Sequence, residues 1–405
     1  MRLLILLWHP SPLGAVGGGF RICEELLKRK PNYIKVDVVD TFPTFLSNIK
    51  DISCHEYRIP KFIKILEKWN FAFERALEWL YACVSIAYLT LKLIRRKYDV
   101  IYVPISELTF TAFPIIILKI LGFFRSRYTK VVIGVMNVGR SGSLRTSYRY
   151  FRKMGLSIIA SIVGSLYVTI NTRLIVLMAN RSDKVVTLSV YLKNLLHQHG
   201  VKKKIIVMPV GIDFKFINKF PKQRKIYDGI FIGRCTPEKG VFDLISVWKI
   251  VTSKFPDAKL AIIGPFTINT YRILIQQIRD QNLMENIIII GPISEYKEII
   301  RNLKSSNFVV FLSVAETWGL VPIEGLACGL PVIVYDLPVY KENIRDCEAT
   351  FLVSIGDYQE VADKIINILN MPKVELYRLN QKARNFSNRF DWGILADRAF
   401  KILME

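Results

Sequence analysis

Two cations flank one loop in the second half of the chain. The segment GRCTPEKG, residues 233–240, places Arg234 and Lys239 between a β-branched run and an amphipathic stretch. An arginine offers a planar fork of N–H donors to two oxygens, and a lysine offers a mobile positive charge. Beside the first turn of a helix, this pair could bind a diphosphate and stabilise the charge that grows on a leaving group. For the loop taken alone, a solvated turn is the alternative.

Two glutamates lie eight positions apart in AETWGLVPIEGLACGLPVIVYD, residues 315–336. Glu316 follows a strand-like run, and Glu324 falls in the first turns of the helix that GLVPIEGLA predicts. A phosphate repels carboxylates, whereas sugar hydroxyls donate hydrogen bonds to them, so we expect one glutamate to bind a ribose and the other a second sugar. The alternative is that Glu324 only complements the helix dipole and that Glu316 is solvated.

The main chain at two helix starts could supply further donors. A helix beginning in GLVPIEGLA leaves its first amides without intrahelical partners, and we expect those of Gly319, Leu320 and Val321 to face an anion. Near the start of the chain, SPLGAVGGGF places Gly18 and Gly19 between a strand and a helix, where glycine lets the backbone approach a ligand closely. The G-x-G-x-x-G spacing of dinucleotide sites is absent there.

Neither metal nor thiol chemistry is indicated. The six cysteines include no C-x-x-C pair, and the four histidines include no H-E-x-x-H or similar spacing. D-x-D, a common way to hold a metal against a diphosphate, does not occur either. We therefore expect phosphate chemistry without a metal ion or a cofactor, in a reducing interior.

The net charge of +23 is concentrated in the first half of the chain. Residues 1–200 hold 29 basic and 12 acidic side chains, whereas residues 201–405 hold 28 and 22. Such a field attracts polyanions, which include nucleic acid, anionic lipid headgroups and phosphorylated substrates. No nucleic-acid-binding motif accompanies the charge, so nucleic acid is not the expected partner.

One uncharged run, MGLSIIASIVGSLYVTINT at 154–172, approaches the length that spans a bilayer. It carries several Ser, Thr and Gly residues, and Lys153 and Arg173 border it. A helix lying on an anionic membrane surface and a buried core helix are both compatible with this pattern. The apolar start, MRLLILLWHP, is expected to form a first buried strand rather than an export signal.

Alternating strands and helices must position these residues. Short β-branched and aliphatic runs separate longer amphipathic stretches, which is typical of parallel sheets with helical crossovers. The first series of predicted strands is 2–8, 33–40, 98–104, 130–136, 183–189 and 204–210. The second series is 227–233, 258–264, 286–291, 307–313 and 331–336. The fold class is therefore α/β, with two doubly wound sheets in tandem.

These motifs together resemble those of the retaining glycosyltransferases of family 4. The likeness rests on IGRCTPEKGVFDL, on ETWGLVPIEGLACGLPVI with its E-x7-E spacing, on VMPVGID before them and on FDWGILADRA after them. The family has the GT-B fold, in which two Rossmann-like domains of doubly wound parallel sheets face a central cleft. The resemblance implies a donor substrate that is a nucleotide-diphosphate sugar of UDP or GDP type.

The resemblance also divides the chain. Residues 1–210 are expected to form the acceptor-binding domain, 211–225 a linker, and 226–385 the nucleotide-sugar-binding domain. Residues 386–405 are expected to form a C-terminal helix that crosses back to the first domain.

The resemblance implies roles for the motif residues as well. Arg234 and Lys239 hold the donor diphosphate and stabilise its departure, Glu316 contacts the donor sugar, and Glu324 binds the ribose. Ile293, in IIGPISE, falls where the family's backbone meets the base. In the front-face route ascribed to this family, the leaving phosphate itself accepts the acceptor's proton, so no dedicated base is required.

The first domain is expected to add to the site. By the same likeness, the loop with Gly18 and Gly19 completes the phosphate and sugar cradle. The family often has a histidine after the fourth strand, whereas VVIGVMNVGRSGS offers Asn137, which can bond a sugar hydroxyl but cannot act as an acid or base. His9 and Glu107 fall at predicted strand ends and could contact the acceptor or the donor sugar, with purely structural roles as the alternative.

The sequence thus predicts a metal-independent retaining hexosyltransferase, cytoplasmic and peripheral on an anionic membrane surface. Its acceptor is expected to be lipid-linked or an anionic glycan, because the first domain is strongly basic. Two alternatives stay open: a non-catalytic GT-B scaffold at a membrane surface, and a soluble synthase that acts on a small sugar.

Overall fold

The structure is a computed structural model, and it describes ten stretches of the chain. These are residues 1–7, 18–40, 49, 52–56, 84–88, 90–92, 97–105, 112–122, 129–138 and 158–405. The candidate residues His9 and Glu107 lie outside them. The chain divides into two compact units at Val210 and Gly211: Gly211–Ile394 belongs to the second unit, and Leu395–Glu405 returns to the first.

The first unit is built on a seven-stranded parallel sheet with the order β3-β2-β1-β4-β5-β6-β7. Its strands are β1 (Arg2–Leu6), β2 (Lys35–Asp40), β3 (Ile52–Glu56), β4 (Val100–Ile105), β5 (Lys130–Val135), β6 (Lys184–Thr187) and β7 (Ile205–Val207). Its named helices are α1 (Gly18–Lys28), α4 (Ala112–Ile120), α6 (Ile158–Arg181) and α7 (Val190–Gln198), with the greater part of α16 (Trp392–Met404). Central strands such as β1 and β5 are buried almost throughout, as continuous apolar runs in a parallel sheet require.

Strand β3 was not predicted, because its sequence ISCHE is mostly polar. The structure explains how such a strand joins the sheet. The His55 Nε2 lies 3.0 Å from the Asp37 Oδ1, and the Tyr98 hydroxyl donates to the Asp37 Oδ2 at 2.8 Å. The buried Asp37 carboxylate therefore has partners on both of its oxygens, as a buried charge needs.

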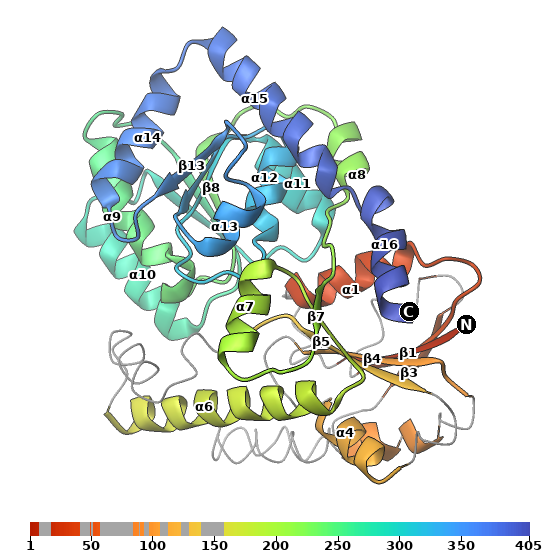
Figure 1. Ribbon diagram of the computed structural model, residues 1–405. Helices are drawn as coiled ribbons and strands as arrows, with labels where there is room; N and C mark the ends of the chain where they lie inside the picture. Colours follow the sequence, from red (N-terminus) through yellow and green to blue (C-terminus); the bar gives the residue numbers. More distant parts are fainter. Residues whose placement is uncertain are drawn as a thin grey trace. The chain divides into compact units, whose positions relative to one another are not determined.

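The second unit is built on a six-stranded parallel sheet with the order β10-β9-β8-β11-β12-β13. Its strands are β8 (Tyr227–Ile232), β9 (Leu260–Ile263), β10 (Ile287–Gly291), β11 (Ser306–Phe311), β12 (Val332–Tyr335) and β13 (Thr350–Val353). Its helices are α8 (Phe214–Lys219), α9 (Val241–Thr252), α10 (Ile268–Asp280), α11 (Tyr296–Lys304), α12 (Leu320–Ala327), α13 (Pro338–Asn343), α14 (Tyr358–Asn370) and α15 (Lys373–Ser387). Figure 1 shows α9 and α14 on one side of this sheet and α11 and α12 on the other.

The strand order of the second unit reverses between β8 and β11. The chain runs outward through β9 and β10, then returns to place β11 on the other side of β8. Helices that follow β8 and β11 therefore begin at one edge of the sheet, on opposite faces. In open α/β sheets such a point is where ligands bind, beyond the carboxyl ends of the strands. Both loops that the sequence singled out lie at this point.

These observations confirm the predicted α/β class with two parallel sheets. All eleven predicted strand runs coincide with observed strands, and β3 and β13 were missed. Residues 211–225, for which a linker was expected, contain α8 and cluster with the second unit. The uncharged run at 154–172 lies largely in α6, and within the described stretches no helix is both long and apolar enough to cross a membrane.

Candidate functional site

The loops after β8 and β11 pack directly against each other. The Val314 N–H donates to the Glu238 carbonyl at 2.9 Å, and the Ser313 hydroxyl donates to the same oxygen at 3.3 Å. Gly240 has φ +76°, and a Cβ there would lie 2.0 Å from the Leu312 carbonyl oxygen. Only glycine allows this approach, so the backbone itself brings the two loops together.

This packing joins two of the predicted site residues. The Lys239 Nζ donates to the Glu316 Oε1 at 2.6 Å, and the two side chains are only 16% and 13% exposed. The ammonium also lies 5.9 Å from the centre of the Phe311 ring. The cation predicted for the diphosphate and the carboxylate predicted for the sugar thus neutralise each other in this structure.

Arg234 lies in the same loop, two residues beyond the end of β8, and its side chain is exposed. The main chain on either side is fixed to the next loop: the Cys235 N–H donates to the Pro265 carbonyl at 2.9 Å, and a Cβ on Gly264 would lie 1.8 Å from the Gly233 oxygen. Burial raises the pKa of the Cys235 thiol to about 12, so this cysteine is not a nucleophile near neutral pH.

Helix α12 begins beside Glu316 without a side-chain cap. Its N-cap, Gly319, has φ +86°, and a Cβ there would lie 2.5 Å from the Tyr340 ring. Leu320 and Val321 form the first turn, whose amides have no carbonyl one turn earlier within the helix. Burial, together with the charge of Glu316, holds the pKa of the Tyr340 phenol well above its usual value, so the ring that flanks this turn stays neutral.

Glu324 lies farther along α12 and is 1% exposed. The Tyr296 hydroxyl, at the start of α11, donates to the Glu324 Oε1 at 3.3 Å. The ring of Tyr296 packs on Phe216 of α8, with a distance of 5.7 Å between ring centres. The carboxylate is therefore oriented by a tyrosine that is itself held by an aromatic contact. Ile293, half-buried in the loop between β10 and α11, comes three residues before this tyrosine.

The structure gathers the second-unit candidates at one edge of their sheet, and the described first-unit candidates belong to α1 and to the chain after β5. Gly18 and Gly19 are the first residues of α1, so the helix begins within the triple glycine that the sequence placed in a loop. Asn137 is exposed and lies two residues past the end of β5. Across the described stretches, no three His, Cys, Asp or Glu residues are grouped so as to hold a metal ion.

Sequence reasoning missed Tyr296 and Phe216. Tyr296 belongs to an amphipathic stretch, where an aromatic residue is ordinarily taken as core, and Phe216 lies in residues 211–225, for which a linker was expected. Only the packing of α8, α11 and α12 shows their relation to Glu324. The one signal in the sequence was the position of Tyr296 at a helix start, a short loop after the end of a strand at Gly291.

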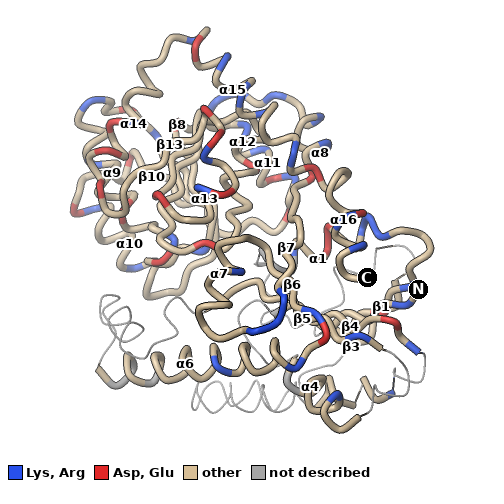
Figure 2. Tube along the Cα trace, in the orientation of Figure 1, with Lys and Arg blue, Asp and Glu red and all other residues tan. Residues whose placement is uncertain are grey.

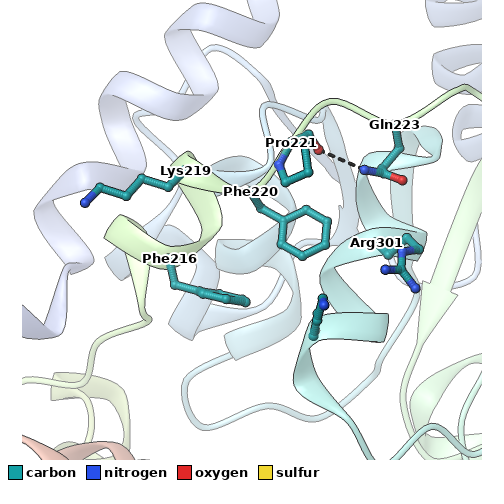
Figure 3. Close-up of a pocket in the computed structure, with 7 residues that line it drawn as sticks. Phe216, Lys219, Phe220, Pro221, Gln223 and Arg301 are labelled. Atoms are coloured by element: carbon teal, nitrogen blue, oxygen red, sulfur yellow. Dashed lines mark hydrogen bonds between the residues drawn. The ribbon is translucent and has the colours of Figure 1, made fainter.

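A groove of about 430 Å³ opens beyond Phe216, away from the two loops. It is lined by residues of α8, of α11 and of the chain between α8 and β8: Phe216, Lys219, Phe220, Pro221, Gln223, Lys297 and Arg301. Figure 3 shows the rings of Phe216 and Phe220 beside each other, with Lys219 extending away from them and Arg301 on the facing helix. None of these residues belongs to the loops after β8 or β11.

Comparison with known proteins shows a family likeness in the second unit. Residues 212–386 match the family model described as glycosyl transferases group 1. An uncharacterized glycosyltransferase of Methanocaldococcus jannaschii is 26% identical over 211 residues, which are 52% of this chain and 56% of that protein. The capsular polysaccharide biosynthesis glycosyltransferase CapM of Staphylococcus aureus is 30% identical over 35% of this chain and 36% of its own.

The match to these curated relatives spans from about a third to about three fifths of their length. A phosphatidyl-myo-inositol mannosyltransferase of Mycobacterium leprae, for example, is 26% identical over 43% of this chain and 45% of that protein.

Solved structures match over nearly the whole chain. Sucrose-phosphate synthase from Thermosynechococcus elongatus has a TM-score of 0.73 at 16% identity, covering 99% of this chain and 98% of its own. HepE of Anabaena, solved in complex with UDP and glucose, has a TM-score of 0.71 at 19% identity, covering 100% of this chain and 99% of its own. These likenesses confirm the two-domain fold of GT-B glycosyltransferases.

Proposed function

We propose that this protein is a retaining hexosyltransferase that uses a nucleotide-diphosphate sugar of UDP or GDP type and needs no metal ion. The observation that carries the proposal is the meeting of Lys239 and Glu316 at the carboxyl edge of β8 and β11, within the stretch that matches the glycosyl transferases group 1 model. A cation from one loop and a carboxylate from the other are the two groups that a sugar diphosphate requires: one for its phosphates and one for its hydroxyls.

Binding of the donor would exchange partners within this pair. The donor diphosphate binds to Lys239, Arg234 and the first amides of α12, where the helix dipole also favours negative charge. Glu316, released from the lysine, accepts hydrogen bonds from the donor sugar. The ion pair thus keeps both groups in place before the ligand arrives.

Glu324 is the proposed ligand of the ribose. A carboxylate has about four lone-pair positions, so Oε1 can accept from Tyr296 while the other oxygen accepts from ribose hydroxyls. Ile293, in the loop before α11, is the proposed neighbour of the base. The first unit is the proposed acceptor-binding domain. Its loop with Gly18 and Gly19 is proposed to complete the phosphate and sugar cradle of the donor, and His9, Glu107 and Asn137 are the candidates for contact with the acceptor or the donor sugar.

The proposed reaction requires no additional proton acceptor. The bond between the anomeric carbon and the β-phosphate oxygen breaks, and the acceptor oxygen forms its bond to the same face of that carbon. The acceptor's proton passes to the leaving phosphate oxygen. Arg234 and Lys239 lower the barrier because they stabilise the negative charge that develops on this phosphate.

A panel of UDP- and GDP-sugars tests the donor proposal by thermal shift and by product analysis. One nucleotide sugar should raise the midpoint of unfolding, by about 2.7 kcal/mol of stability at a concentration 100 times its Kd. Arg234→Ala should abolish this shift, and Arg279→Ala, in the last turn of α10, should keep it. EDTA should change neither binding nor turnover, and the product should keep the anomeric configuration of the donor. A chain that no nucleotide sugar stabilises would be a scaffold rather than an enzyme.

We further propose that the acceptor is lipid-linked or an anionic glycan, and that the first unit lies on an anionic membrane surface. The first half of helix α6 supports this part because its apolar side chains are exposed. Ile158, Ile162, Leu166 and Ile170 are 57%, 44%, 44% and 56% exposed, at every fourth position. Figure 2 shows the helix free of charged residues except near and beyond its middle.

The hydroxyl groups of α6 face inward instead. Ser161, Ser165 and Thr169 are buried, and the Thr169 hydroxyl donates to the Ser165 carbonyl at 2.8 Å, one turn earlier. The Ser165 hydroxyl donates to the Ser161 carbonyl in the same way, so the helix backbone satisfies the hydroxyls of Ser165 and Thr169. Helix α4, which packs against α6, also exposes apolar side chains, among them Leu121 just after its end, at 66%. Two neighbouring helices with apolar outer faces, in the basic half of the chain, suit the interface of an anionic bilayer.

Flotation with vesicles of phosphatidylcholine and phosphatidylglycerol tests the membrane proposal. Wild-type protein should bind in a salt-sensitive manner. The variant Ile162→Ser/Leu166→Ser should bind at least tenfold less, since each side chain removes about 1.5 to 3 kcal/mol of apolar burial in the bilayer. Ile273→Ser, an exposed isoleucine of α10, is the matched control. Equal binding by all three proteins would exclude α6 as the lipid contact, and no binding would favour a synthase that acts on a small sugar.

A further inference from the structure

We propose that the groove between α8 and α11 is a second ligand site, which binds a phosphorylated sugar and acts on the nucleotide site through Phe216, Tyr296 and Glu324. The coupling rests on the proposed function, whereas the binding does not. The groove, of about 430 Å³, has the size of an ordinary small-molecule pocket.

The lining of the groove selects an anion. Lys219, Lys297 and Arg301 are among its seven lining residues, and no Asp or Glu is. Glu298 is the acidic residue of α11, and both of its carboxylate oxygens accept hydrogen bonds from one nitrogen of Arg301, Nη1. In the described part of the chain, the Nε and Nη2 groups of this half-exposed arginine have no partner, and together they match two phosphate oxygens.

The walls of the groove are apolar and already fixed. Phe216 and Phe220 pack edge to face, with 5.8 Å between ring centres, and Phe220 is 8% exposed. The Lys304 Nζ donates to the Phe220 carbonyl and lies 5.8 Å from the centre of its ring. Aromatic rings that hold their position without a ligand offer flat apolar faces to the C–H side of a sugar ring, at little cost in side-chain entropy.

A polar group at the edge adds an acceptor for hydroxyls. The Gln223 side-chain amide donates to the Pro221 carbonyl at 3.1 Å, as Figure 3 shows, which fixes the side chain and leaves its oxygen available. A ring with hydroxyls therefore fits between the aromatic walls and Gln223, with its phosphate on Arg301 and Lys297. A bare alkyl phosphate would use only the cations.

The groove and the nucleotide site share one wall. Phe216 lines the groove, its ring packs on the ring of Tyr296, and the Tyr296 hydroxyl donates to Glu324. A ligand that rests on Phe216 restricts this ring, and with it the tyrosine that orients the carboxylate. Occupation of the groove should therefore raise the affinity for the nucleotide, and by linkage the nucleotide should raise the affinity of the groove by the same factor.

Titration of the full chain with glucose 6-phosphate, without nucleotide, tests the site by calorimetry. Glucose 6-phosphate should bind more tightly than inorganic phosphate, and glucose should not bind. Arg301→Gln should weaken the binding about tenfold, and Arg279→Gln, also an exposed arginine in the last turn of a helix, should not change it. Phe216→Leu should bring glucose 6-phosphate down to the affinity of inorganic phosphate. Equal affinities for the two phosphates in wild-type protein, or an unchanged affinity in Arg301→Gln, would overturn the proposal.

Two further arms separate the source of the phosphate and the link to the donor. Phosphatidylglycerol has a headgroup in which a phosphodiester is joined to a polyol. If a lipid supplies the ligand, Arg301→Gln should bind vesicles of this lipid more weakly than wild-type protein does. Equal vesicle binding by the two proteins, together with no binding of glucose 6-phosphate, would overturn the site. UDP and GDP are titrated with and without glucose 6-phosphate in wild type and in Tyr296→Phe. An effect in wild type that the variant loses supports the coupling, and no effect in either refutes it. A chain that binds glucose 6-phosphate but no nucleotide would refute the proposed donor site and leave the groove standing.

Discussion

The Lys239 ammonium lies 2.6 Å from the Glu316 carboxylate in the second unit, although the two residues are 77 positions apart. Each is held by a different loop, and each is mostly buried. An ion pair of this kind places two reactive groups before substrate arrives, but it must open for either group to bind a ligand. The two partners should therefore respond in opposite ways to mutation.

Glu316→Gln should keep or raise the affinity for UDP or GDP, because the lysine loses its competitor for the diphosphate. Lys239→Gln should lower that affinity by tenfold or more, since a charge-assisted hydrogen bond contributes about 1.5 to 3 kcal/mol. Both variants should lose most of their turnover. Calorimetric titration with the nucleotide alone measures the difference, and an equal loss of affinity in both variants would contradict the exchange of partners.

Gly240→Ala should lower the free energy of unfolding of the second unit by more than the cost of placing an alanine at a positive φ. The left-handed backbone costs an alanine about 1 to 2 kcal/mol, and the clash with the Leu312 carbonyl adds to it. Gly356→Ala is the matched control, because Gly356 has φ +86° and a Cβ there would meet nothing within 4 Å. Urea unfolding should show the larger loss for Gly240→Ala; equal losses would mean that the two loops separate easily.

Tyr296→Phe should weaken nucleotide binding by about threefold to tenfold, because the long 3.3 Å hydrogen bond that orients Glu324 contributes no more than an ordinary hydrogen bond, about 0.5 to 1.5 kcal/mol. The loss should be smaller for the 2′-deoxy nucleotide, because that ligand already lacks one of the hydroxyls that Glu324 is proposed to bind. Tyr377→Phe, at a tyrosine that is 59% exposed, serves as the control. Tighter binding by Tyr296→Phe would mean that the tyrosine blocks the carboxylate instead of orienting it.

Stability should fall above pH 9 through two buried thiols. Burial raises the pKa of Cys235 and of Cys328 to about 12 each, from an ordinary value of 9.0. Between these values the unfolded chain loses protons that the folded chain keeps, so the folded state is stable below pH 9 and loses stability as pH rises toward 12. The slope is about 1.4 kcal/mol per pH unit for each thiol.

Urea unfolding from pH 8.5 to 10.5 measures this slope. Cys235→Ala and Cys328→Ala should each make it shallower by about 1.4 kcal/mol per pH unit, whatever the variant's stability at pH 8.5. A slope that is identical in wild type and variants would show that these thiols ionise in the folded protein.

Periodicity predicted most of the fold because buried parallel strands are continuous apolar runs. It missed β3, whose polar residues join the sheet through the contact of His55 with Asp37, and β13, a strand of four residues at the other edge of its sheet. The sequence also placed Gly18 in a loop, whereas α1 begins there. Helix starts within glycine runs depend on tertiary contacts that composition does not reveal.

The candidate site was predictable in its parts but not in its contacts. Arg234 and Glu316 could be placed at strand ends from local patterns. The meeting of Lys239 with Glu316 could not, since it depends on β8 and β11 being neighbours despite the two strands between them in sequence. The groove beside α8 gave no signal, because five of its seven lining residues lie in 211–225, which reads as a polar connection, and the other two lie on a helix far along the chain.

The proposed phosphate loop, residues 233–240, contacts the neighbouring loops through main-chain atoms. Gly233 and Gly264 approach so closely that no side chain fits between them, and Gly240 meets Leu312 in the same way. The fold and the proposed chemistry therefore depend on different positions. In a library of variants selected only for folding, these glycines should be retained and Arg234 should be replaced freely. In a library selected for turnover, the glycines and Arg234 should all be retained. A variant of this chain could therefore lose its catalytic activity and still keep its fold.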